Sequence, residues 1–154
     1  MLLGGALAIL AAIAAGEFMA SGLARRSFVF YALDNGSVVV EERVLRVSKG
    51  SPGRPSREVD IARYVEEALL GPASPQCVPL FPQETRLVSL LYRDGVVYAH
   101  LSENAAMPLS EGPSGSTVFA NIETLYAGIK RNFPYVRDTR FFIAGNAAYA
   151  GKFR

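Results

Sequence analysis

The sequence contains few of the residues on which most enzymes depend. Its 154 residues include one histidine, one cysteine and no tryptophan. A lone cysteine, Cys77, cannot form an internal disulfide and excludes a cysteine-rich zinc site. Any histidine-dependent reaction must use His100. These shortages exclude several common catalytic centres.

The chain also lacks an excess of charge of one sign. It has 16 basic and 14 acidic side chains, giving a formal net charge of +2. Nucleic-acid-binding domains usually show a concentrated basic stripe, so we expect no nucleic-acid partner. Because 50% of the residues are hydrophobic, the length and composition predict one domain with a sizeable core.

No group of residues indicates a metal or a cofactor. Adjacent acidic pairs, such as Glu41-Glu42, point in different directions on a strand or a helix. The segment from Gly112 to Ser116 precedes a predicted helix and could offer backbone amides to an anion. It lacks the Lys-Ser/Thr ending of a phosphate-binding loop. We therefore expect no cofactor.

The N-terminal segment is apolar, and its role has more than one interpretation. Residues 2–15 carry no charge, and the apolar character continues to Ala24 with one interruption at Glu17. Residues 1–24 predict a signal sequence or, over residues 2–24, a membrane anchor, and a buried helix is the alternative. With a signal sequence or an anchor, the domain is exported or membrane-tethered. Because Arg25 and Arg26 follow the segment, the positive-inside tendency favours the opposite orientation, which stays open.

The remaining chain predicts strands and helices in alternation. An apolar run over residues 28–33, a turn at residues 34–36 and a β-branched run from Val38 indicate a hairpin. A helix follows Ser56 and stops at Gly71-Pro72, because glycine suits the left-handed position and proline cannot continue the helix. Asp94-Gly95 predicts a second hairpin. A second helix, led by Ser114 or Ser116, places Val118, Ile122, Leu125 and Ile129 on one apolar stripe. It precedes a last strand over residues 139–144.

This order predicts an α+β fold. The elements read β-β-α-β-β-α-β, which gives a two-layer sandwich with a mixed, largely antiparallel sheet and two helices. The domain covers residues 27–151, and residues 152–154 form a short tail. Alternation along the second hairpin predicts a core face made of Val88, Leu90, Tyr92, Val97, Ala99 and Leu101. The opposite face is a candidate interaction surface made of Leu87, Leu91, Val96 and Tyr98.

His100 also lies on that opposite face and is the one candidate for a catalytic base. Ser102 shares the strand face, but side chains two residues apart stand about 6–7 Å apart. Ser89, across the hairpin, is better placed for a hydrogen bond. Neither serine has an orienting acid or a glycine-rich nucleophile turn beside it. A hydrolase using His100 is therefore the least favoured hypothesis.

Seven short motifs occur in an order that resembles the GerMN domain family of bacterial sporulation and germination proteins. They begin with "FVFYAL" at Phe28 and "VVVEERVLRV" at Val38, and "ALLGP" at Ala68 ends the first helix. A proline and a threonine precede the Asp-Gly hairpin, which a serine ends. The second helix and a final strand that reaches glycine complete the pattern. The motif residues are Glu41, Glu42, Arg43, Leu69, Leu70, Gly71, Pro72, Pro82, Thr85, Ser102, Thr124 and Gly145.

The resemblance implies an extracytoplasmic, membrane-anchored or lipidated module without known catalytic activity. Members act in cell-envelope processes, and their fold is similar to ring-building motifs that pack side by side. We therefore expect a non-catalytic interaction or assembly module that binds an envelope protein or copies of itself. The alternative is a domain that binds an envelope ligand, a glycan or an anion, through the aromatic residues Tyr92, Tyr98, Phe141 and Phe142.

Overall fold

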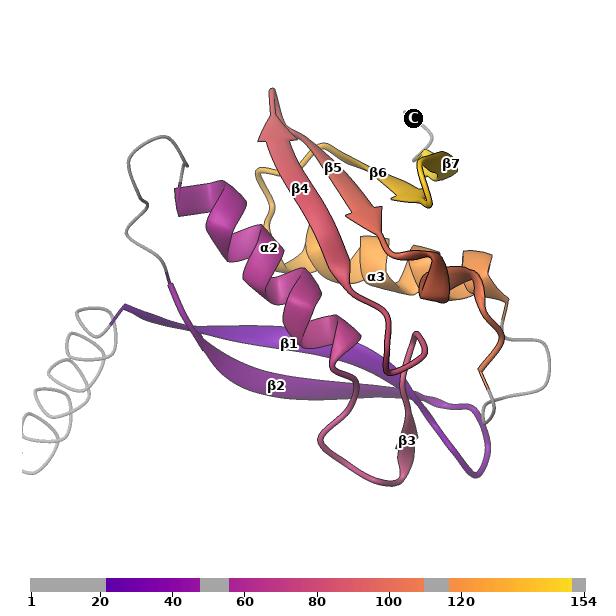
Figure 1. Ribbon diagram of the computed structural model, residues 1–154. Coiled ribbons are helices and arrows are strands. Elements are labelled where there is room, and N and C mark those ends of the chain that lie inside the picture. The colour runs from indigo at the N-terminus through magenta and orange to yellow at the C-terminus, as the bar shows by residue number, and fades with distance from the viewer. Residues whose placement is uncertain (1–21, 48–55, 110–116, 151–154) are drawn as a thin grey trace, which may run out of the picture.

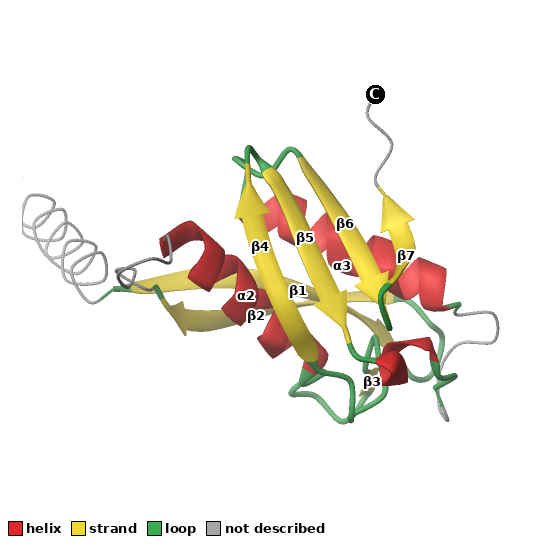
Figure 2. Cartoon of the chain, turned by 45° about the horizontal axis from the view of Figure 1, so that its top comes forward, coloured by secondary structure: helices red, strands yellow, loops and turns green. Residues whose placement is uncertain are grey.

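The computed structural model describes residues 22–47, 56–109 and 117–150, whose strands divide between two sheets (Figures 1 and 2). One sheet has three strands in the order β2-β1-β3, and the other has four in the order β4-β5-β6-β7. The predicted α+β class is confirmed. The elements are β1 (Leu23–Ala32), β2 (Val38–Arg46), α2 (Ser56–Leu69), β3 (Cys77–Val78), β4 (Leu87–Arg93), β5 (Val96–Leu101), η1 (Glu103–Ala106), α3 (Val118–Asn132), β6 (Asp138–Ile143) and β7 (Asn146–Ala150).

Strands β1 and β2 form the first hairpin and pair from Leu23↔Arg46 to Tyr31↔Val38. The hairpin agrees with the prediction, but β1 begins four residues before the expected domain start at residue 27. Leu23 and Ala24, the end of the predicted membrane segment, therefore belong to this strand. Pairing continues past Arg25 and Arg26 because β2 is long enough to supply partners. Residues 1–21, the rest of that segment, lie outside the described residues.

The second hairpin contains the predicted Asp-Gly turn and a bulge that was not predicted. Asp94 and Gly95 both have positive φ, 52° and 80°, as a type I′ turn requires. The register shifts between Leu87 and Ser89, which reverses the predicted faces at the start of β4. Val88, expected in the core, is 59% exposed, whereas Leu87 packs against the core. A bulge inserts one residue, and this changes the side to which its neighbours point.

The C-terminal part of the four-stranded sheet contains one more strand than expected. Strand β6 pairs with β5 in parallel, and β7 pairs with β6 in antiparallel register. Ala144 and Gly145 form the turn between them, with φ of 48° and 81°. The sequence analysis predicts no strand after residue 144. The Gly145-Asn146 pair is a hairpin signal that could have revealed β7.

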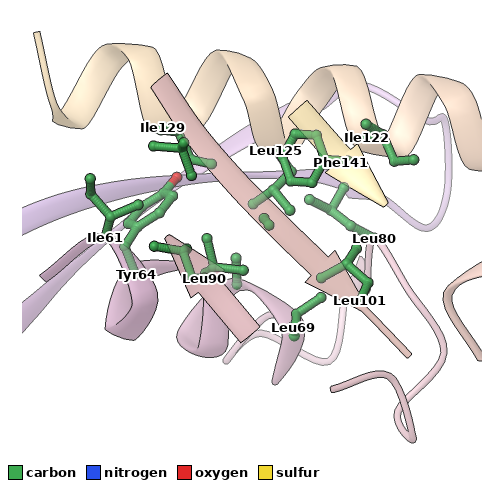
Figure 3. Close-up of a cluster of buried hydrophobic side chains, with 14 of the residues drawn as sticks. Ile61, Tyr64, Leu69, Leu80, Leu90, Leu101, Ile122, Leu125, Ile129 and Phe141 are labelled. Atoms are coloured by element: carbon green, nitrogen blue, oxygen red, sulfur yellow. The ribbon is translucent and has the colours of Figure 1, made fainter. Parts of the chain in front are cut away.

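Both helices pack against both sheets, and their apolar stripes form the core (Figure 1). Figure 3 shows side chains of α2, α3, β4, β5 and β6 meeting in one cluster. The predicted stripe of α3 is confirmed, since Ile122, Leu125 and Ile129 are buried. The N-cap of α3 is Thr117, whose Oγ1 accepts a hydrogen bond from the Ala120 amide. The serines expected to lead this helix lie outside the described residues.

A chain of aromatic rings connects the two sheets through the core. Phe28 of β1 stacks on Tyr64 of α2 with ring centroids 4.6 Å apart. Tyr64 contacts Phe133, Phe133 contacts Tyr135, and Tyr135 contacts Tyr92 of β4, at centroid distances of 5.6, 5.9 and 5.7 Å. Burial raises the pKa of the Tyr64 phenol well above its ordinary value. Edge-on and stacked aromatic pairs add to the stabilisation that burial alone provides.

Two strand edges are closed by polar side chains rather than by further strands. The Glu58 carboxylate of α2 accepts a hydrogen bond from the Tyr92 amide of β4 at 3.0 Å. The Asn132 side chain of α3 binds the free side of β1, accepting from Ser27 N at 2.9 Å and donating to Ser27 O at 2.7 Å. Covering an edge in this way prevents it from pairing with another chain.

Candidate functional site

Motif residues from two separate segments, "EER" and "LLGP", meet around the guanidinium group of Arg43. Its Nη2 donates to Glu41 Oε2 at 2.8 Å and to the Gly71 carbonyl at 2.7 Å. Its Nη1 donates to the Glu67 carbonyl at 3.2 Å. These carbonyls belong to the last turn of α2 and to the residues that follow it, where helix carbonyls have no intrahelical partner. Arg43 therefore attaches the end of α2 to strand β2.

The same guanidinium lies over two core aromatic rings, and Glu41 is held by backbone amides. The Arg43 Cζ atom is 4.9 Å from the Phe28 ring centroid and 5.5 Å from that of Phe30. The Glu41 carboxylate accepts from the amides of Ala73 and Ser74, the nearest at 3.1 Å. Burial raises the pKa of Glu41, but the hydrogen bonds from Arg43 and the two amides outweigh it and lower the pKa below the ordinary 4.5.

This arrangement gives the motif cluster a structural use. Each nitrogen of the Arg43 guanidinium donates to an acceptor within the chain, and both Glu41 oxygens accept hydrogen bonds from the chain itself. The Gly71 φ of 87° confirms the predicted helix stop. A Cβ atom added to Gly71 would lie 3.2 Å from the Pro79 Cβ atom. The "EER" and "LLGP" motifs thus describe one joint between β2 and α2.

The other motif residues lie at turns and element ends. Ser102 Oγ accepts a hydrogen bond from the Arg86 amide at 3.1 Å, which closes the open end of the second hairpin. Thr124 Oγ1 and the Tyr31 hydroxyl are 2.6 Å apart and join α3 to β1. The remaining residues divide into those that are buried, Leu69 and Thr85, and those that are exposed or at a turn, Glu42, Leu70, Pro72, Pro82 and Gly145.

The outer face of the four-stranded sheet carries a shallow hollow of about 440 Å³. The hollow is lined by Ser89, Leu90, Leu91, Tyr98, His100, Phe142 and Gly145. Leu91 is 52% exposed, and Tyr98 is half-buried. Leu91 and Tyr98, two members of the predicted interaction surface, are therefore brought together here. Val96 lies on the same face, and Leu87 lies on the other because of the bulge.

Two positive side chains flank the hollow. The Arg140 Cζ atom lies 5.6 Å from the Tyr98 ring centroid, and Arg93, paired with Val96 at the end of β4, has a side chain that is 78% exposed. The four aromatic residues predicted to bind a ligand lie on opposite faces of the sheet. Tyr98 and Phe142 line the hollow, whereas Tyr92 and Phe141 belong to the core side. Neighbouring residues of β6 point to opposite faces, so Phe141 and Phe142 cannot share one site.

His100 takes part in a structural hydrogen bond. Its Nε2 accepts from the Gly145 amide at 3.0 Å, so this lone pair is already used. Ser89 lies directly across from His100 in the β4–β5 register, and Ser102 Oγ binds Arg86. The described residues contain no group of three His, Cys, Asp or Glu side chains arranged to hold a metal ion. The half-buried Cys77 lines a separate hollow near the turn of the first hairpin.

Most of the predicted membrane segment, residues 1–21, lies outside the described residues. Within residues 22–47, 56–109 and 117–150, no helix is both long and apolar enough to span a bilayer.

Comparison with known proteins identifies the family. Residues 29–148 match the family Germane, described as sporulation and spore germination. No curated protein gives a significant match. The fold is similar to that of the first GerMN domain of the sporulation protein GerM from Bacillus subtilis, with a TM-score of 0.53 and 14% identity over 80% of this chain and 85% of that one.

Two further solved structures share this fold. The tandem GerMN domains of GerM align with a TM-score of 0.54 and 17% identity over 81% of this chain. The alignment spans 40% of that protein. A lipoprotein candidate from Clostridium perfringens aligns with a TM-score of 0.51 and 17% identity, over 81% of this chain and 77% of that one. The chain therefore belongs to the Germane family and contains a GerMN-type domain.

Proposed function

We propose that this domain is a non-catalytic interaction module of the bacterial cell envelope. It binds a partner protein through the outer face of the four-stranded sheet. The observation that carries the proposal is the hollow on this face, which is lined by the exposed side chain of Leu91 and by the half-buried rings of Tyr98 and Phe142. Contiguous apolar side chains on a surface, surrounded by polar ones, are typical of protein contacts.

The chemistry of this face suggests the kind of partner. Its centre is apolar and aromatic, with Leu91, Tyr98 and Phe142. Arg93 and Arg140 lie at its border. Tyrosine and arginine are enriched in protein interfaces, where an aromatic anchor fills a pocket and charged groups at the rim select the partner. We infer a partner with an apolar protrusion and acidic side chains around it.

The envelope location is supported by the family and by the predicted N-terminal segment. The family is described by sporulation and spore germination, and one protein of similar fold is a lipoprotein candidate. Residues 1–24 predict export or anchoring, which would place the domain at a membrane. Protease protection of the full chain in intact cells, compared with lysed cells, tests on which side of the membrane the domain lies.

Site-specific photo-crosslinking tests the proposed surface. A photoreactive amino acid at position 91 is expected to capture one envelope protein in intact cells, and the same group at Leu70, which is 75% exposed, is expected not to. The captured protein is then purified. Leu91→Glu should weaken its binding to the full chain by about tenfold or more, because a carboxylate replaces an apolar contact and would face the partner's acids.

Leu70 is the matched control position for Leu91. Leu70→Glu introduces the same charge at an exposed leucine of another surface and should leave the binding unchanged. Equal capture from positions 70 and 91, or an unchanged affinity of Leu91→Glu for the purified partner, would show that this face is not the contact.

A glycan or anion ligand is the second candidate function. The hollow holds two aromatic rings beside His100 and Ser89, and a sugar ring could lie against them. The division of the four predicted aromatic residues between two faces leaves less stacking surface for it. Direct titration with envelope glycan fragments tests this candidate, and binding that Tyr98→Ala and Phe142→Ala both abolish would favour it over the protein partner.

A further inference from the structure

Strand β2 has an edge that differs from the two closed by Glu58 and Asn132. It lies at the end of the strand order β2-β1-β3, and no described residue forms a strand beyond it. It runs for nine residues, Val38–Arg46, without a proline and without a register shift against β1. A long, flat and uninterrupted edge is a template for pairing with another chain.

The register of the first hairpin determines which backbone groups face outward. Val47 N donates to Gly22 O, and Ala32 N donates to Ser37 O, so the odd-numbered residues of β2 bond to β1. By the alternation of an antiparallel ladder, the even-numbered residues direct their N–H and C=O groups away from β1. Among the described residues, no hydrogen bond satisfies these groups at Val38, Val40, Glu42 or Val44. The next carbonyl, that of Arg46, accepts from Arg63.

The side chains along this edge favour pairing as well. Val38, Val40 and Val44 are 64%, 45% and 50% exposed, and β-branched side chains pack well across neighbouring strands. Glu42 lies among them, and its Oε2 is 3.3 Å from Arg25 Nη1 of β1. The edge therefore presents a row of valines and one carboxylate that already has a cationic neighbour.

We propose that β2 pairs with β2 of a second copy of this chain, so that two three-stranded sheets become one continuous sheet across a two-fold axis. Residues 40–44 read Val-Glu-Glu-Arg-Val, which is nearly the same in both directions. The two positions that exchange, Glu41 and Arg43, carry opposite charges and are already paired with each other within each chain. An antiparallel pair centred on Glu42 places Val40 opposite Val44 of the second copy, and Glu41 opposite Arg43 of the second copy.

This register is the one in which the chemistry matches. A shift by two residues places the Glu42 carboxylate opposite a valine, and a shift by one exchanges the two faces of the strand. In the centred register all outward N–H and C=O groups from Val38 to Val44 have partners. The cost is that the two Glu42 side chains lie opposite each other. The Arg25 guanidinium beside each Glu42 offsets this repulsion.

The self-complementary pattern is the reason for choosing a second copy over an unrelated strand. An unrelated extended segment would need valines at the same spacing, whereas a second β2 carries them by two-fold symmetry. This surface lies on the three-stranded sheet and is separate from the outer face of β4–β7. The proposal therefore stands or fails independently of the partner proposed above.

Sedimentation of the full chain, in a density-matched mild detergent, tests self-association. Unaltered protein should show a concentration-dependent dimer. The double variant Val40→Lys/Val44→Lys places lysines opposite each other and should raise the dissociation constant about tenfold or more. Leu70→Lys/Met107→Lys is the matched control, since these two side chains are also exposed, at 75% and 57%, and it should not change the constant. Far-ultraviolet circular dichroism verifies that each variant is folded.

Cysteine crosslinking tests the register itself. In a Cys77→Ser background, Glu42→Cys should give a covalent dimer with a short bismaleimide. Val40→Cys alone should not, because the two copies of residue 40 would lie four residues apart, about 13 Å along the strand. Mixing Val40→Cys with Val44→Cys should restore the crosslink.

Three results would overturn the proposal. The first is a monomer at all concentrations. The second is dimerisation that the β2 lysines do not weaken, or weaken no more than the control does. The third is a Glu42→Cys crosslink to a different protein in cells and none between two copies, which would assign the edge to another partner.

Discussion

The two sheets are attached to the helices by different kinds of contact. In the three-stranded sheet, polar side chains make many of the attachments: Arg43 binds the end of α2, and Asn132 binds the free side of β1. In the four-stranded sheet, the inner face is mostly apolar, and the Glu58–Tyr92 hydrogen bond attaches α2 at its edge. Val97, Ala99 and Leu101 are fully buried against the helices. A two-stranded ribbon with a short third strand has little area to bury, so hydrogen bonds position it instead.

This difference explains where the family motifs lie. The "EER" and "LLGP" residues cluster at the polar attachment, because a guanidinium that satisfies helix carbonyls requires one residue type in one place. The four-stranded sheet can exchange one apolar residue for another of similar volume. The outer face of this sheet contains few motif residues, so the proposal for it rests on geometry rather than on the motifs.

The largest effect is expected from removing the polar attachment. Arg43→Ala should lower the free energy of unfolding by about 3 kcal/mol, since Glu41 loses its ion-pair partner and two carbonyls lose a donor. Urea denaturation measures this. The control, Arg25→Ala, breaks a pair whose side chains are 67% and 58% exposed and should cost less than about 0.5 kcal/mol. Equal costs would mean that the Arg43 cluster does not position the sheet.

The aromatic chain between the sheets is the next most sensitive region. Gly128 of α3 lies against Tyr64, and a Cβ added there would collide with the Tyr64 hydroxyl. Tyr64 is 1% exposed and stacked on Phe28, so it cannot withdraw. Gly128→Ala should cost about 2 kcal/mol in thermal or urea unfolding.

A second substitution distinguishes a collision from a general loss of stability. Tyr64→Phe alone removes the hydroxyl that donates to Ser27 O and should cost about 1 kcal/mol. In the double variant the added methyl instead faces the ring at 3.4 Å, so the double variant should be more stable than the sum of the two single costs predicts. Simple additivity would contradict the proposed collision.

Acid should weaken the three-stranded sheet first. Because the folded pKa of Glu41 lies below 4.5, its contribution to stability is fully present above 4.5 and is lost as pH falls through the lower folded value. Glu41→Gln should therefore reduce the loss of stability between about pH 7 and pH 3. Urea midpoints across this range provide the measurement. An unchanged pH profile in Glu41→Gln would show that other carboxyl groups determine the acid response.

The smallest effect, a stabilisation, is expected in the four-stranded sheet. Ala144 has a φ of 48° in the β6–β7 turn, where a side chain is strained and glycine is not. Ala144→Gly should raise the free energy of unfolding by about 0.5 kcal/mol. Ala73→Gly, at a residue without positive φ, should be neutral or destabilising. If both substitutions have the same sign and size, the turn strain is absent.

Features that depend on a few neighbouring residues could be predicted from the sequence. The Asp94-Gly95 turn, the helix stop at Gly71 and the apolar stripe of α3 are examples. Each follows from backbone freedom or helical spacing within a few positions. The bulge in β4, the strand β7 and the contacts at the strand edges were not predicted, because each requires a partner that is distant in sequence. The bulge at Val88 requires β5, and β7 forms only when β6 supplies a partner.

The candidate sites show the same division. The order of the motifs indicated Glu41, Arg43 and Gly71. Nothing in the sequence indicates that the Arg43 guanidinium binds the carbonyl of Gly71, which lies 28 positions later. Leu91, Val96 and Tyr98 lie on the predicted face of the sheet, whereas Leu87 lies on the other face because one inserted residue reversed its direction.

The sequence by itself determined the α+β class, the local turns, the helix ends and membership in a family. The class, the turns and the helix ends arise from backbone preferences and from apolar spacing, which act over short distances, whereas the family follows from the order of the motifs. Only the tertiary structure decided that the strands form two sheets, that the motif residues make a joint between β2 and α2, and that no other described strand pairs with the outer edge of β2. These depend on which distant groups satisfy each other's hydrogen bonds and exclude water, and that balance exists only when the whole chain is packed.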